Sequence, residues 1–362
     1  MKQNFHNLLR VPLLVLGMAS LVVGTLAGIA RLGWSVPPVG LSQIPHHGVL
    51  MVAAFFGTVI GLERAVAIAK GWAYSAPLLS GLGGISLMLG FDPQLGFGLI
   101  LLSSVIFVAA SVAVLKIQPA IHNWILLSGA IGLVVGNLLL LLGVHMQISV
   151  LWWMVYLVLT IAGERLELSR LAIRSDRKRQ GLAVLSLLPW LGALIGIWRF
   201  SLGELIVAVG ILAIALWLIS YDIARRTVRQ SGLPRFTAFC MLAGYGWLFV
   251  AALLLLLNNL SVMVVVRDTP LHALFLGFVF SMVLGHALII FPAVTRLKIP
   301  YSPLFYIPLV FLHGTLLVRV TGGLSLQTKL YALGGLLNAV ALVVFIAAMI
   351  YAIYRGARSR RS

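Results

Sequence analysis

Apolar runs long enough to cross a bilayer follow one another along almost the whole chain, separated by short segments with charged residues, proline, glycine or asparagine. A helix needs about 20 such residues to cross the hydrocarbon core. The sequence therefore predicts an all-α polytopic membrane protein, one transmembrane domain over residues 1–362 with short loops. Twelve helices are predicted, near residues 11–32, 46–68, 73–91, 94–115, 123–143, 148–168, 182–198, 203–221, 234–257, 271–295, 302–320 and 330–354.

The composition excludes a water-soluble globule. Of the 362 residues, 61% are hydrophobic and 9% are charged, whereas soluble proteins carry about 25% charged residues. The single cysteine, Cys240, excludes an internal disulfide, a CxxC metal site and covalent c-type haem. We therefore expect any metal to be held by histidine, methionine or carboxylate.

The basic residues predict the topology. The formal net charge of +18 is typical here of basic loops that set orientation, so no nucleic-acid partner is expected. With twelve helices, 21 of the 26 basic residues lie on the side of both termini. The positive-inside rule assigns this side to the cytoplasm of a bacterial-type inner membrane, and the lipid bilayer is the expected partner.

Similar sequences at the ends of two predicted helices indicate an internal repeat. The second predicted helix ends in Gly-Leu-Glu-Arg at residues 61–64, and the sixth ends in Gly-Glu-Arg at 163–165. This spacing favours three pseudo-repeated four-helix units, and chance identity is the alternative. Adjacent Glu63–Arg64 and Glu164–Arg165 are interpreted as ion pairs that anchor helix ends. A proton path through Glu63 is the alternative for the first pair.

Three histidines lie at one predicted level near the outer face. His46 and His47 begin the second helix and His272 begins the tenth, and the topology gives both helices the same direction. Ionisable residues in membrane helices are costly and mark functional sites. Neutral imidazole can ligate haem iron without a buried charge. We therefore predict a b-type haem held by His272 and by His46 or His47.

A second pair of histidines lies deeper in the predicted membrane. His286 and His313 are on consecutive antiparallel helices at depths that agree within a helical turn. They are predicted to form an inner site for a second haem or for copper. The alternative for each histidine is a hydrogen bond to a neighbouring helix.

Three segments carry a family resemblance. Residues 46–64 begin His-His-Gly and end Glu-Arg, residues 271–282 begin Leu-His-Ala-Leu-Phe-Leu-Gly, and residues 285–287 are Gly-His-Ala. They resemble the NnrS family of twelve-span haem- and copper-containing membrane proteins, which is associated with nitric oxide resistance and is similar to haem-copper oxidases. The resemblance implies haem ligation by His46 or His47 and by His272.

The sequence also departs from these families. Residues 148–168 and 182–198 contain no histidine, so the copper-binding histidines of haem-copper oxidases have no counterparts on the sixth and seventh helices. Oxygen reduction at the standard binuclear centre is therefore not expected. The second helix also lacks the His-x-His-Glu form associated with the NnrS family.

Three functions compete at this point. The first is a haem protein for electron transfer, or for binding or detoxification of a small gas such as nitric oxide, with an unidentified electron donor and an oxidoreductase activity left open. The second is a secondary transporter without cofactor, since twelve spans suit that architecture. The third is a scaffold subunit whose histidines only form hydrogen bonds.

Overall fold

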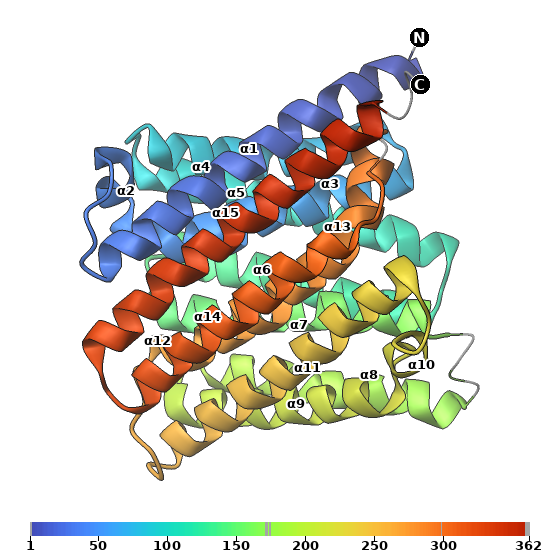
Figure 1. The fold of residues 1–362 in the computed structure, drawn as a ribbon. Helices are drawn as coiled ribbons and strands as arrows, with labels where there is room; N and C mark the ends of the chain where they lie inside the picture. Colours follow the sequence, from blue (N-terminus) through green and yellow to red (C-terminus); the bar gives the residue numbers. More distant parts are fainter. Residues whose placement is uncertain (1, 171–172, 174, 298, 359–362) are drawn as a thin grey trace. The chain divides into compact units, whose positions relative to one another are not determined.

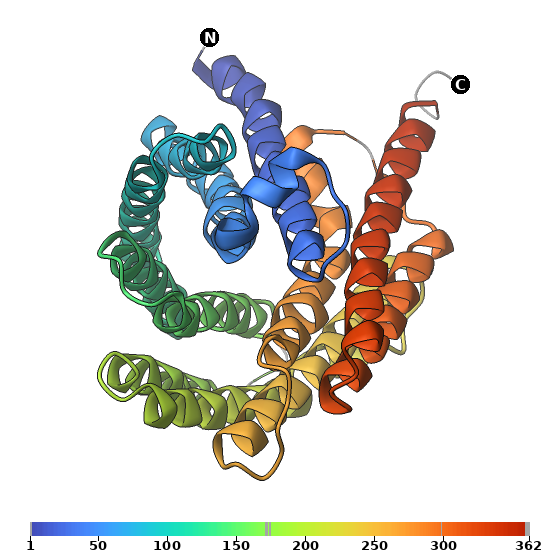
Figure 2. The ribbon, with the colours of Figure 1, turned by 90° about the vertical axis from the view of Figure 1, so that its left-hand side faces the viewer.

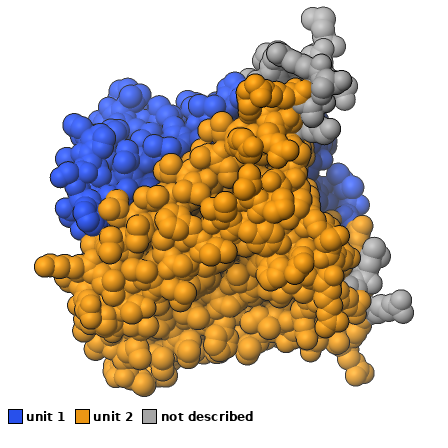
Figure 3. All heavy atoms as spheres, viewed as in Figure 1, with its two compact units in different colours: residues 1–163 blue, residues 164–362 orange. Residues whose placement is uncertain are grey.

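The computed structural model describes residues 2–170, 173, 175–297 and 299–358, and within these ranges it contains helices and no strands (Figure 1). Ten helical segments in these ranges are long and apolar enough to cross a membrane. The chain is therefore an all-α, multi-pass membrane protein, and a lipid bilayer is its surroundings. The chain divides into two compact units, unit 1 at Met1–Gly163 and unit 2 at Glu164–Ser362 (Figure 3).

Unit 1 contains the first six of the twelve predicted helices. In chain order its elements are α1 (Lys2–Arg31), α2 (Pro38–Ser42), the 3-10 helix η1 (Ile44–His46), the π-helix η2 (Val49–Phe56), α3 (Gly57–Ile68), the 3-10 helix η3 (Gly71–Tyr74), α4 (Ser75–Met88), α5 (Pro93–Ile117), α6 (Ile121–Leu141) and α7 (Met146–Leu168).

Within unit 1, each helix packs on its neighbour in the chain. The pairs α4–α5 and α5–α6 pack together, and α4 to α7 form a curved row (Figure 2). Helix α5 begins where Asp92 accepts a hydrogen bond from the Gln94 backbone N–H at 2.9 Å, with Pro93 at the first helical position. Both features stabilise a helix N-terminus. The boundary between the units lies inside α7.

Unit 2 contains the other six predicted helices. Its elements are α8 (Asp176–Ile195), α9 (Phe200–Tyr221), α10 (Ala224–Thr227), α11 (Gly232–Asn259), α12 (Asp268–His272), the π-helix η4 (Ala273–Val279), α13 (Phe280–Thr295), the 3-10 helix η5 (Pro303–Phe305), α14 (Tyr306–Leu324) and α15 (Thr328–Arg358).

Two helical hairpins organise unit 2. Helices α8 and α9 form one hairpin, and α14 and α15 form the other (Figure 1). A Cβ atom on Gly192 of α8 would lie 2.7 Å from the backbone oxygen of Gly203 on α9. This backbone approach is possible only for glycine, as the small-residue pattern of membrane helix pairs requires.

All twelve predicted apolar runs contain a helix, but two of these helices fall outside the ten candidate spans. The run at 73–91 forms α4, which has only 14 residues because it starts after η3 and ends before Gly90, whose φ is 75°. The run at 182–198 forms α8, which starts six residues earlier, at Asp176, and so includes a charged first turn. The fold is therefore that of a multi-pass membrane protein, and the count of twelve crossings remains a prediction.

Candidate functional site

His47 lies two residues before the π-helix η2, which begins at Val49, and against helix α1. Its Nδ1 atom lies 2.7 Å from the backbone oxygen of Gly24. A Cβ atom on Gly28, one turn further along α1, would lie 2.7 Å from the Cε1 atom of the ring. The absence of a side chain at Gly28 therefore makes room for the imidazole. Because a carbonyl can only accept, Nδ1 carries the proton and the lone pair of the ring is on Nε2.

His46 has a different environment within unit 1. Its Nδ1 atom lies 3.0 Å from Oε1 of Gln43, whose amide nitrogen donates to the backbone oxygen of Leu87 at 2.9 Å. The ring also meets that of Phe97 on α5 edge-on, with 5.9 Å between the centroids. Burial lowers the pKa of His46, which lies outside the candidate spans, below its ordinary value. His46 is therefore neutral at pH 7 and tied to α4 and α5.

His272 ends helix α12 in unit 2. Its Nδ1 atom lies 2.7 Å from the backbone oxygen of Asp268, one turn earlier. This carbonyl places the proton on Nδ1 and the lone pair on Nε2, as at His47. The first residue after His272 begins the π-helix η4. His272 and His47 therefore share a ring tautomer and a position at the start of a π-helical segment.

The two π-helical segments in the described ranges are η2 and η4, which lie in the second and tenth predicted helices. Such segments are rare and occur frequently at functional sites, since the wider turn changes the direction of the side chains around it. Sequence periodicity did not predict them. Their positions single out the two helices that carry the predicted outer haem ligands.

His286, on α13, points its ring at an arginine. Nδ1 lies 2.9 Å from the backbone oxygen of Met282, which leaves the lone pair on Nε2. That Nε2 atom lies 3.5 Å from Nη1 of Arg165, near the inner end of α7. The guanidinium always carries its charge and only donates. It directs a donor and a positive charge at the nitrogen that a metal ion would need.

Arg165 is held by a buried acid that the sequence analysis missed. Its Nε and Nη2 atoms each donate to the Asp222 carboxylate at 2.9 Å, and the Ser169 hydroxyl donates to the same carboxylate at 3.3 Å. The Arg165 and Asp222 side chains are 5% and 0% exposed. We name Arg165, Ser169 and Asp222 the Arg165 cluster. Asp222, on the turn after α9, is thus an ion-pair partner of Arg165 that the sequence analysis did not include, and a pair between Arg165 and the adjacent Glu164 stays a prediction.

His313, on α14, is bound through its other ring nitrogen. The Trp247 indole N–H donates to Nδ1 at 2.8 Å, and the two rings stack at 17°. An indole only donates, so the lone pair is on Nδ1 and the proton is on Nε2. The Nε2 atom is buried and has no hydrogen-bond partner among the described residues.

The inner histidines thus have separate partners. Over the described ranges, no hydrogen bond or ring contact joins His286 to His313, and each lone pair faces a donor. This chemistry disfavours a shared metal, although a two-histidine site there stays a prediction. The same ranges contain no group of three or more His, Cys, Asp or Glu side chains that could hold a metal ion. Glu63, on α3, has Arg64 as its charged neighbour, and the proton path through it also stays a prediction.

A search for relatives gives one finding. A family model described as Domain of unknown function (DUF8744) matches residues 10–354, almost the whole chain. No curated protein matches the chain.

Proposed function

We propose that this chain, which belongs to the family described as Domain of unknown function (DUF8744), binds a b-type haem through His47 and His272 and serves in electron transfer. The observation that carries this proposal is the shared environment of the two histidines. Each has Nδ1 at 2.7 Å from a backbone carbonyl oxygen, and a π-helical segment begins two residues after His47 and one residue after His272. A histidine that ligates a metal through Nε2 usually donates its Nδ1–H to a carbonyl or carboxylate oxygen.

The residues around His47 suit an axial ligand. The backbone oxygen of Gly24 fixes the tautomer and raises the basicity of the ring. Gly28 leaves space for the ring on α1. His46 is the weaker choice, because its ring is held against Phe97 and its acceptor is a side-chain amide.

The two-histidine ligation favours electron transfer over gas binding. A haem supplies a one-electron couple whose potential depends on its axial ligands. His47 and His272 would both hold the haem iron. The resemblance to the NnrS family supports nitric oxide as a second candidate ligand, and its binding would require one histidine to leave. We do not extend the proposal to copper at His286 and His313, because Arg165 and Trp247 face their lone pairs.

We further propose that the chain crosses the membrane twelve times, with α4 and α8 as the two additional crossings and both termini in the cytoplasm of a bacterial-type inner membrane. The distribution of basic residues supports this topology.

The test is the absorption spectrum of the chain purified in detergent after expression with sufficient haem supply. The wild-type protein is expected to show a Soret band and reduced b-type bands. His47→Ala and His272→Ala are each expected to lose them, since each removes one axial ligand.

His46→Ala and His286→Ala are the matched controls, because each removes a partly buried histidine with a ring nitrogen that already contacts another side chain, Gln43 or Arg165. Both are expected to retain the bands. A wild-type protein without a Soret band would exclude the haem proposal. Loss of the bands from His46→Ala with retention in His47→Ala would move the ligand to the neighbouring residue.

A further inference from the structure

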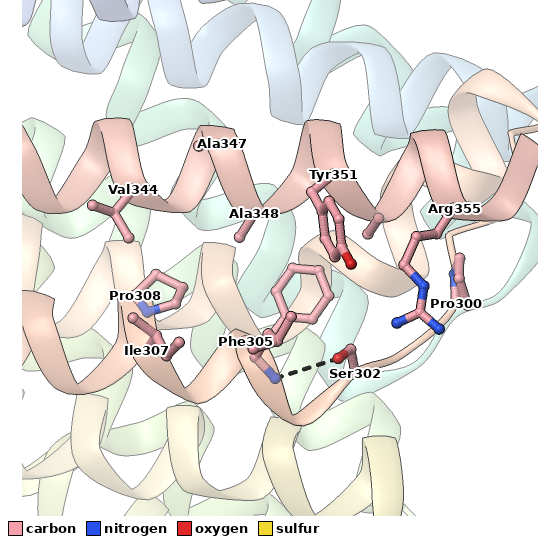
Figure 4. Close-up of a pocket in the computed structure, with 12 residues that line it drawn as sticks. Pro300, Ser302, Phe305, Ile307, Pro308, Val344, Ala347, Ala348, Tyr351 and Arg355 are labelled. Carbon is pink, nitrogen blue, oxygen red and sulfur yellow. Dashed lines mark hydrogen bonds between the residues drawn. The ribbon is translucent and has the colours of Figure 1, made fainter.

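A groove of about 270 Å³ lies between two helices of unit 2, along the α14–α15 hairpin (Figure 4). Val344, Ala347 and Ala348 of α15 line one side, and Ile307 and Pro308 of α14 line the other. Three polar side chains lie toward one end of the groove, those of Ser302, Tyr351 and Arg355. The groove therefore has an apolar body and a polar, positively charged end.

The sequence explains why this groove stays open. Ala347, Ala348 and Ala352 place only methyl groups on the lining face of α15. Opposite them, Pro308 lies in the first turn of α14, where its missing N–H costs no helical hydrogen bond. The hairpin packs closely further along, where a Cβ atom on Gly334 would lie 2.5 Å from the Arg319 backbone nitrogen. The space is therefore confined to the end of the hairpin near Arg355.

The charged end lies at the level of a membrane surface. Helix α15 begins at Thr328 and carries Lys329 near one end and Arg355 near the other. These two residues are separated by about 39 Å along a helix, close to the thickness of a bilayer with its headgroups. Tyr351 and Tyr354, which are 49% and 52% exposed, lie beside Arg355 as interfacial aromatic residues do. In the proposed topology this surface is cytoplasmic.

Arg355 has the charge to bind a phosphate. It is exposed, and in the ranges described here no carboxylate forms an ion pair with it. A guanidinium binds a phosphate through two parallel hydrogen bonds. The Tyr351 and Ser302 hydroxyls at the same end can donate further hydrogen bonds. The cytoplasmic leaflet is rich in anionic phospholipids, which basic pockets between membrane helices recognise.

We propose that this groove binds one anionic phospholipid, with an acyl chain along the alanine face of α15 and the phosphate on Arg355. The apolar body accounts for the chain and the arginine for the headgroup charge. The site is independent of the haem proposal, since neither His47 nor His272 lines the groove.

The experiment compares two lipids with identical acyl chains. Delipidated full-length protein in detergent is incubated with phosphatidylglycerol or with phosphatidylcholine, and bound lipid is counted by native mass spectrometry. The wild-type protein is expected to prefer phosphatidylglycerol. Arg355→Gln is expected to lower the affinity for phosphatidylglycerol roughly fivefold, the effect of one basic residue near an anionic headgroup, and to remove the preference. Ala348→Phe is expected to weaken binding of both lipids.

The matched control is Arg358→Gln, which removes a cation from the same helix end. Arg358 lies over the Tyr354 ring at 4.6 Å and does not line the groove, so the preference is expected to persist. Arg355→Lys is expected to keep part of it. Equal binding of both lipids by the wild type, or an unchanged preference in Arg355→Gln, would overturn the proposal. Displacement of phosphatidylglycerol by equimolar inorganic phosphate would also overturn it, since the acyl chain would then contribute nothing.

Discussion

His47 and His313 are both largely enclosed imidazoles, and their neighbours give them opposite chemistry. The carbonyl of Gly24 places the proton of His47 on Nδ1, whereas the indole N–H of Trp247 places that of His313 on Nε2. Sequence position alone does not distinguish the two cases, because the acceptor and the donor come from other helices. The neighbours of each ring therefore decide which nitrogen keeps the lone pair that a metal would need.

The Arg165 cluster gives a prediction about stability. Asp222→Asn leaves the buried Arg165 guanidinium without its counter-charge, and removing one partner of a buried pair costs about 3–5 kcal/mol. We expect a large loss of thermal stability in detergent, measured by the unfolding midpoint. Asp176→Asn is the control, because the Arg179–Asp176 pair has side chains 32% and 78% exposed and such pairs contribute about 0–1 kcal/mol. Equal losses in the two variants would contradict a structural role for the buried pair.

His46 is expected to make the stability of the protein depend on pH. Burial lowers the pKa of His46 below the ordinary 6.5. Below pH 6.5 the unfolded chain therefore binds more protons than the folded chain, so stability is complete above pH 6.5 and is lost as the pH falls toward the folded value. The unfolding midpoint of the wild type is expected to drop modestly between pH 7.5 and 5.5. His46→Gln should show a smaller drop, and an identical one would show that His46 contributes nothing.

At the scale of elements, apolar length predicts where helices occur but not how they turn. All twelve predicted runs contain helices because the bilayer requires every backbone group to be bonded within the segment. The π-helical turns of η2 and η4 leave no mark in apolar periodicity. The partner of Arg165 was equally hidden, since Asp222 is 57 residues away and adjacency favoured Glu164. The sequence thus predicts which histidines belong to the candidate site. It does not predict the π-helical turns and the distant side chains that orient them.

The close approach of His47 to Gly28 of α1 predicts the effect of a substitution at this glycine. In Gly28→Ala the added Cβ atom would lie 2.7 Å from Cε1 of His47, so the ring must move. If His47 ligates haem, the variant is expected to show a weakened Soret band per chain. Gly98→Ala on α5 is the control, because nothing lies within 4 Å of its Cβ position. An undiminished band in Gly28→Ala would show that the position of the ring on α1 is unimportant for the cofactor.

At the scale of the whole molecule, α4 and α8 decide the topology. If both cross, the turn before α7 is outside and the segment before α8 is cytoplasmic. If α4 does not cross, both assignments reverse, whereas α8 follows both positions in the chain and leaves them unchanged. Cys240 is fully buried, so an engineered cysteine can be labelled selectively by an impermeant maleimide.

We expect His145→Cys to be labelled in intact cells, because His145 is exposed in the turn before α7. Arg177→Cys, exposed near the start of α8, is expected to be labelled only after permeabilisation. These outcomes follow from the twelve-crossing arrangement and the positive-inside rule. Reversed labelling of both positions would show that α4 does not cross and would place the basic segment outside.

The π-helical segments also allow the two halves of a crossing to be set independently. One residue corresponds to about 100° of rotation around an α-helix. The N-terminal part of the second predicted helix, with His47, is joined to α3 through η2, and the N-terminal part of the tenth, with His272, is joined to α13 through η4. Losing a single residue within η2 or η4 would swing the histidine to another azimuth while the inner half kept its packing. An insertion or deletion within either segment would therefore change the direction of an imidazole without changing the packing of the helix that follows it.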